Sequence, residues 1–109
     1  MTQDIYTIIP NLQNLVEEIQ TDSITSRSFY KGNGLNAILF AFDAGQGLSE
    51  HKAPFDAVVT ILDGQAEITI GGKPSIVKTG EMMIMPANIT HALQAHERFK
   101  MLLVMIRGE

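Results

Sequence analysis

The chain has 109 residues, of which 45% are hydrophobic and 18% charged, and its formal net charge is -4. This composition is typical of one folded domain and excludes a disordered chain, while the lack of any run of Lys or Arg argues against nucleic acids and anionic membranes as partners. The absence of cysteine excludes disulfides and thiolate metal sites. With no signal peptide and no membrane-spanning stretch, we expect a cytoplasmic protein.

The first expected element in chain order is a short N-terminal helix. Apolar residues recur at steps of three and four, the period of one helix face, at Ile9, Leu12, Leu15, Val16 and Ile19. We expect this helix to pack its apolar side on the body of the domain or on a partner subunit.

After this helix, the sequence predicts a series of short strands. Runs rich in apolar and β-branched residues alternate with the turn sequences KGNG, DAGQG, DGQ and GGKP. The expected strands cover Ala37–Phe42, Ala57–Leu62, Ala66–Ile70, Ser75–Lys78, Met82–Met85, His91–Ala95 and Lys100–Ile106. About eight strands at this density favour an all-β antiparallel sandwich or barrel. We assign the helical segment and first strands to residues 1–34 and the barrel to residues 35–109, within one domain.

Two stretches of this barrel region carry regularly spaced Gly, His and Pro residues. The positions that recur on schedule are Gly45, His51, Gly64, Gly80, Pro86 and His91. Over residues 35–106 these spacings resemble the paired signatures of the cupin superfamily. The resemblance implies a cupin jelly-roll β-barrel, also called a double-stranded β-helix, and a homodimer.

The resemblance also locates a candidate metal site. In metal-binding cupins, two His and one Glu of the first motif and one His of the second converge inside the barrel. Here Ala53 stands at the second His place and Ala57 at the Glu place. Strand alternation predicts that if His51 faces inward, residues 53, 55, 57 and 59 do as well. Two imidazoles are fewer donors than a metal site normally uses, so two alternatives stay open: a divalent transition metal held by His51 and His91, or none.

Without a metal, the two imidazoles are expected to face a small apolar cavity. The candidate ligand-binding residues are His51, His91, Phe40, Phe42, Phe55, Val59, Ile61 and Met85. Such a pocket suits a small organic ligand of modest polarity, for example a ring carbonyl or carboxylate compound. A neutral imidazole can also act as a general base, which makes His51 and His91 the candidate catalytic residues.

Three functions are compatible with this pattern. The first is a small-molecule-binding cupin, with or without acid–base chemistry of the isomerase, epimerase or lyase type. The second is a metal-dependent, dioxygenase-like enzyme built on an incomplete His site. The third is a non-catalytic ligand-sensing module that signals through its dimer. A purely structural role of both histidines at strand ends is the simpler alternative, and His96, which lies among charged residues, is expected to be solvated.

Overall fold

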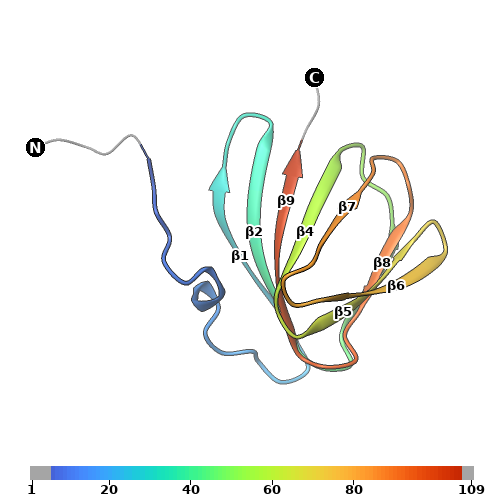
Figure 1. The fold of residues 1–109 in the computed structure, drawn as a ribbon, viewed down its shortest axis with the longest axis horizontal. Coiled ribbons are helices and arrows are strands. Elements are labelled where there is room, and N and C mark those ends of the chain that lie inside the picture. Colours follow the sequence, from blue (N-terminus) through green and yellow to red (C-terminus); the bar gives the residue numbers. More distant parts are fainter. Residues whose placement is uncertain (1–5, 107–109) are drawn as a thin grey trace, which may run out of the picture.

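The structure is a computed structural model and describes residues 6–106. Within this range the chain forms one 3₁₀ helix and nine strands (Figure 1). The elements are η1 (Leu12–Leu15), β1 (Ile24–Lys31), β2 (Leu35–Phe42), β3 (Gly47–His51), β4 (Asp56–Asp63), β5 (Gln65–Ile70), β6 (Lys73–Lys78), β7 (Met82–Met85), β8 (His91–Gln94) and β9 (Phe99–Ile106).

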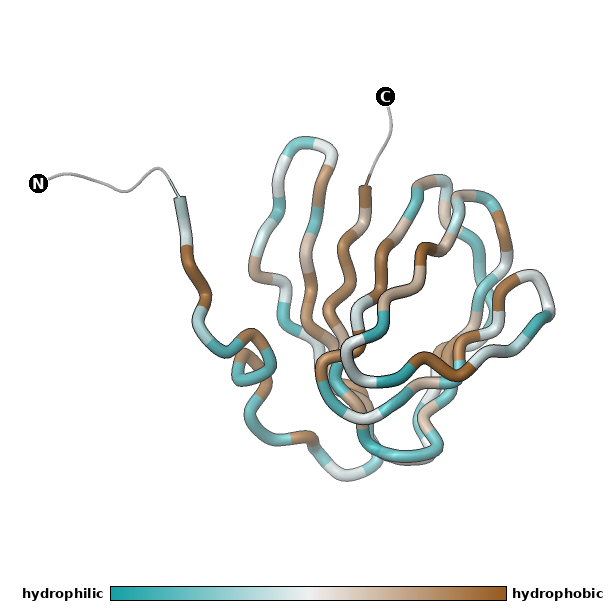
Figure 2. The backbone as a smooth tube through the Cα atoms, viewed as in Figure 1, coloured by the Kyte–Doolittle hydropathy of each residue, from teal (hydrophilic) through white to brown (hydrophobic). Residues whose placement is uncertain are grey.

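The strands form two antiparallel sheets that face each other. The five-stranded sheet has the order β1-β2-β9-β4-β7, and the four-stranded sheet has the order β3-β8-β5-β6. Strands that are distant in sequence are therefore neighbours, as β2 and β9 are along their whole length. The hydrophobic stretches follow the strands, and the turns are mostly hydrophilic (Figure 2). This is the all-β jelly-roll architecture that the sequence predicts.

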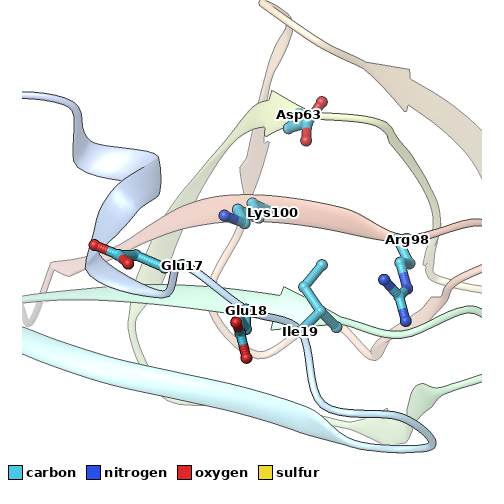
Figure 3. A pocket seen from close by; sticks show the side chains of 6 residues that line it. All are labelled: Glu17, Glu18, Ile19, Asp63, Arg98 and Lys100. Carbon is cyan, nitrogen blue, oxygen red and sulfur yellow. The ribbon is translucent and has the colours of Figure 1, made fainter.

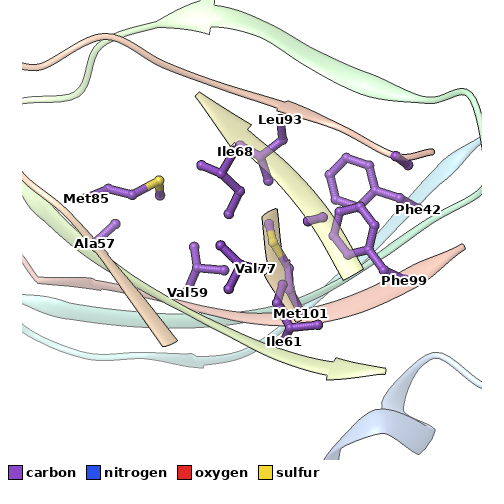
Figure 4. Packing of buried hydrophobic residues seen from close by; sticks show 12 residues of the cluster. Phe42, Ala57, Val59, Ile61, Ile68, Val77, Met85, Leu93, Phe99 and Met101 are labelled. Atoms are coloured by element: carbon purple, nitrogen blue, oxygen red, sulfur yellow. The ribbon is translucent and has the colours of Figure 1, made fainter. Parts of the chain in front are cut away.

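The main core lies between the two sheets. Alternation along each strand sends every second side chain inward, so that Val59 and Ile61 of β4 and Ile68 of β5 are fully buried (Figure 4). The rings of Phe42 and Phe99 stack at a centroid distance of 4.5 Å. Burying one such large side chain stabilises the fold by about 1.5–3 kcal/mol.

The N-terminal segment covers part of the outer face of the five-stranded sheet. Val16 packs there on Leu39 and Ala41 in a second, smaller buried cluster. The segment is held at η1 by Lys100, whose ammonium group donates a hydrogen bond of 3.0 Å to the Gln13 carbonyl. It therefore does the covering that was expected of the N-terminal helix.

The helix itself is much shorter than expected. Only Leu12–Leu15 is helical, because Asn11 has a left-handed backbone (φ 51°) and Val16 is already extended (φ -126°). A short helix is marginal without tertiary support. Here Val16 and Ile19 reach the sheet from an extended chain instead. With four residues, the one helix in the described range is too short to cross a membrane.

The turn between β4 and β5 requires glycine. Gly64 has a φ of 78°, and a Cβ atom at this position would overlap the carbonyl oxygen of Arg98. Only glycine, which has no Cβ atom, can adopt this positive φ at low cost and also lie this close to the Arg98 carbonyl oxygen. Asn88 has a φ of 63°, a left-handed conformation that asparagine adopts more readily than most residues other than glycine.

Candidate functional site

Strand register brings the two candidate histidines together. β3 and β8 are antiparallel neighbours, and His51 lies directly opposite His91 after a register shift that follows Leu48. Directly opposed side chains in a sheet are close enough to touch. The ring centroids are 4.1 Å apart, with the rings in an edge-to-face arrangement. Two residues separated by forty positions in sequence therefore form one pair.

This pair lines a small cavity between the two sheets. The cavity has a volume of about 180 Å³ and is lined by His51, Ala53, Phe55, Ala57, Met85, His91, Leu103 and Met105. Residues 51, 53, 55 and 57 all reach it, which is the alternation that the sequence predicts. Apart from the two imidazoles, every lining side chain within residues 6–106 is apolar.

Backbone hydrogen bonds fix the segments that border the cavity. The Asn88 N–H donates to the Ala53 carbonyl at 2.8 Å, which ties the loop before β4 to the loop after β7. The carboxylate of Asp56, the first residue of β4, accepts a second bond, from the Ala87 N–H in the loop after β7 at 2.8 Å. The Asp56 carboxylate is thereby engaged outside the cavity, as its position in the alternation requires.

Each imidazole makes a local hydrogen bond that determines its tautomer. Nδ1 of His51 lies 2.8 Å from the Ser49 carbonyl oxygen, and Nδ1 of His91 lies 3.3 Å from that of Ile89. A carbonyl oxygen can only accept, so each Nδ1 carries the hydrogen. In the neutral rings, both Nε2 atoms consequently keep a lone pair and act as acceptors.

His91 is the more enclosed ring of the pair, since it is buried and His51 is exposed. Burial lowers the pKa of His91 below its ordinary value of 6.5, and the charge that His51 carries when protonated lowers it further. The hydrogen bond to Ile89 opposes this shift in part. His91 is therefore a neutral imidazole at pH 7.

The residues present do not fit a divalent metal ion. The methyl groups of Ala53 and Ala57 line the cavity at the two places where a cupin metal site has its second His and its Glu. In the part of the chain that the structure describes, no three His, Asp or Glu side chains lie together as a metal-binding group. A protein site for zinc normally supplies at least three such donors.

The cavity walls differ in part from those expected. Phe55 and Met85 line the cavity, whereas the other four candidates lie outside its lining. Of these, Phe42, Val59 and Ile61 are buried in the core, and Phe40 packs against it. Leu103 and Met105 line the cavity and were not expected, although the alternation of β9 places them on the same face as Met101.

A second, larger hollow lies where the N-terminal segment crosses the sheet (Figure 3). It has a volume of about 460 Å³ and is lined by Glu17, Glu18, Ile19, Asp63, Arg98 and Lys100. Both of its cations already have partners. Arg98 binds Asp43 at 2.8 Å, and Lys100 donates to the Gln13 carbonyl. This hollow is a contact region between two parts of the fold, and the histidine cavity is the candidate site.

The third histidine lies apart from the site. His96 is exposed and pairs with Glu67 at 3.2 Å, with Nε2 facing the carboxylate. It is outside the cavity lining. It therefore provides a control position for the two histidines of the cavity.

Solved structures share this fold over nearly the whole chain. A conserved protein of unknown function from Streptococcus pyogenes is 37% identical with a TM-score of 0.82, over 99% of this chain and 92% of that one. A cupin 2 conserved barrel domain protein from Leptotrichia buccalis is 43% identical with a TM-score of 0.85, over 89% of this chain but 47% of that one. A cupin superfamily protein from Desulfitobacterium hafniense is 27% identical with a TM-score of 0.84, over 89% and 88%.

No curated protein matches this chain. The model of one protein family, described as the cupin domain, matches residues 38–106. The match spans β2 to β9 and includes both histidines of the cavity. The chain belongs to the cupin family.

Proposed function

We propose that this cupin binds a small organic molecule in the cavity formed by His51 and His91, without a divalent metal ion. One observation carries the proposal: among the described residues, the two imidazoles are the only polar side chains that line an otherwise apolar cavity of about 180 Å³. Ligand pockets are typically apolar, with a few convergent polar groups that orient the ligand. The lining has this composition, with methyl groups at the two remaining metal-ligand places.

The same arrangement suits acid–base chemistry on a bound ligand. Nε2 of a neutral imidazole can take a proton from the ligand and later return it, which is the elementary step of isomerases, epimerases and lyases. His91 is available for this role because its burial keeps it neutral at pH 7. A sensing protein with the same cavity would bind its ligand without turnover, so product formation separates the two functions.

A metal-dependent, dioxygenase-like function is the less favoured alternative. It would need donors that the described part of the cavity lining does not contain, because Ala53 and Ala57 contribute only methyl groups. Water would have to complete the coordination of any divalent ion held by two imidazoles. Such a site is weaker than one with three or four protein ligands.

The test is a thermal-shift screen of small fragments in the presence of a chelator. We expect stabilising compounds, because a ligand that binds only the folded state raises the melting temperature. The stabilisation is expected to disappear in His51→Ala and in His91→Ala, and to persist in the control His96→Ala. Hits that stabilise all three variants equally, or hits that require an added metal ion, would contradict the proposal.

A further inference from the structure

The tautomers of the two imidazoles restrict the chemistry of a ligand that the cavity can take. Nδ1 of each ring is occupied by a carbonyl oxygen two residues earlier in the chain. No hydrogen bond joins either Nε2 to another residue in the described range. Two acceptor lone pairs are therefore left for a ligand, and the lining residues that the structure describes supply no side-chain donor.

The size of the cavity restricts the ligand as well. An apolar cavity of about 150 Å³ holds one benzene molecule. The cavity of about 180 Å³ thus accommodates one six-membered ring with one or two small substituents. Phe55, Met85 and Leu103 are among the side chains that would contact the apolar part of this ring.

We propose that the cavity selects small one-ring molecules that donate hydrogen bonds through hydroxyl or N–H groups, and that it discriminates against molecules of the same size whose polar groups only accept. This inference rests on the proposed function, and it reverses the expectation of a ring carbonyl or carboxylate ligand. A carbonyl oxygen would meet an Nε2 lone pair and leave both unpartnered. Leaving one buried polar group without a partner reduces affinity by roughly tenfold to a hundredfold.

Cyclohexanol and cyclohexanone form a matched pair of probes for this test. Both have one six-membered ring and one oxygen, but only the alcohol donates a hydrogen bond. Titration by NMR at pH 8 is expected to show that the full-length protein binds the alcohol at least about tenfold more tightly. The ratio of the two affinities is expected to fall toward one in His51→Ala and His91→Ala, and to be unchanged in His96→Ala.

The outcomes separate this inference from the proposed function. If cyclohexanone binds as tightly as cyclohexanol or more tightly, and His51→Ala and His91→Ala bind neither compound, the preference for hydrogen-bond donors is wrong. The proposal that the cavity binds a small organic molecule would still hold. A native protein that binds neither probe and no other fragment would overturn both. Melting temperatures of the variants show whether each remains folded, and the native affinity ratio decides the inference even if a variant does not fold.

Discussion

His91 combines two constraints that act in opposite directions. Burial lowers its pKa, whereas the bond from Nδ1 to the Ile89 carbonyl raises it, and burial has the larger effect. The side chain therefore stays neutral at pH 7 and holds its Nε2 lone pair available in the cavity. The burial that keeps His91 neutral for ligand binding also makes the stability of the fold depend on pH, because protonating the buried ring is unfavourable.

We expect the free energy of unfolding to fall as the pH drops below about 6.5. The pKa of His91 is lower in the folded than in the unfolded state, so the unfolded state takes up the proton first. The stabilisation is complete above 6.5 and is lost as the pH falls toward the folded pKa. Urea denaturation at several pH values measures this slope, and His91→Gln should flatten it.

Asp43 does not interfere with this measurement. The Asp22 N–H and the Arg98 guanidinium hold the pKa of the Asp43 carboxyl below 3.8, so its contribution to stability is lost only at lower pH. Equal stability of the native chain at pH 7 and pH 5, or the same slope in His91→Gln, would contradict the account of His91.

At the scale of elements, the turns between strands are set by individual residues. Gly64, in the turn that leads from β4 to β5 of the other sheet, and Gly72, in the hairpin turn between β5 and β6, both have a positive φ, of 78° and 83°. Their surroundings differ, because an added Cβ at Gly64 would overlap the Arg98 carbonyl, whereas nothing lies within 4 Å of one at Gly72. Alanine at Gly72 therefore tests the cost of backbone strain alone, and alanine at Gly64 tests the cost of strain together with steric overlap.

We expect Gly72→Ala to destabilise the fold by about 1–2 kcal/mol, the cost of a left-handed backbone with a Cβ atom. Gly64→Ala is expected to destabilise it by distinctly more, because the Arg98 carbonyl is backbone and cannot move aside without shifting β9. Urea denaturation of both variants gives the comparison. Equal losses would show that the overlap at Gly64 is relieved without cost.

The N-terminal segment illustrates what periodicity can and cannot predict. The apolar residues from Ile9 to Ile19 correctly indicate a segment that covers the sheet, since Val16 is buried there. They do not determine its conformation, because an extended chain can also bring Val16 and Ile19 to the surface of the sheet. The left-handed backbone at Asn11 ends the helix on one side, and the sequence gives no clear sign of it.

For the whole molecule, the sequence predicts the fold well and the site only in part. The spacing of the motif residues from Gly45 to His91 reflects the lengths of the strands and turns between them, so it predicts the jelly-roll fold. Alternation also predicts that His51, Ala53 and Ala57 share a face. It does not predict which of the inward-facing residues line the cavity, as Met105 does, and which lie outside its lining, as the buried Val59 does. That division depends on how the two sheets pack on each other, which the alternation within a single strand does not determine.

The central claim is that methyl groups at Ala53 and Ala57 make this barrel an organic-ligand pocket rather than a divalent metal site. Elemental analysis after dialysis against zinc and removal of free metal tests it directly. The native chain is expected to retain less than about a tenth of an ion, and the double variant Ala53→His with Ala57→Glu about one, because three His and one Glu complete a four-donor site. A native chain that retains one zinc ion, bound through His51 and His91, would contradict the account.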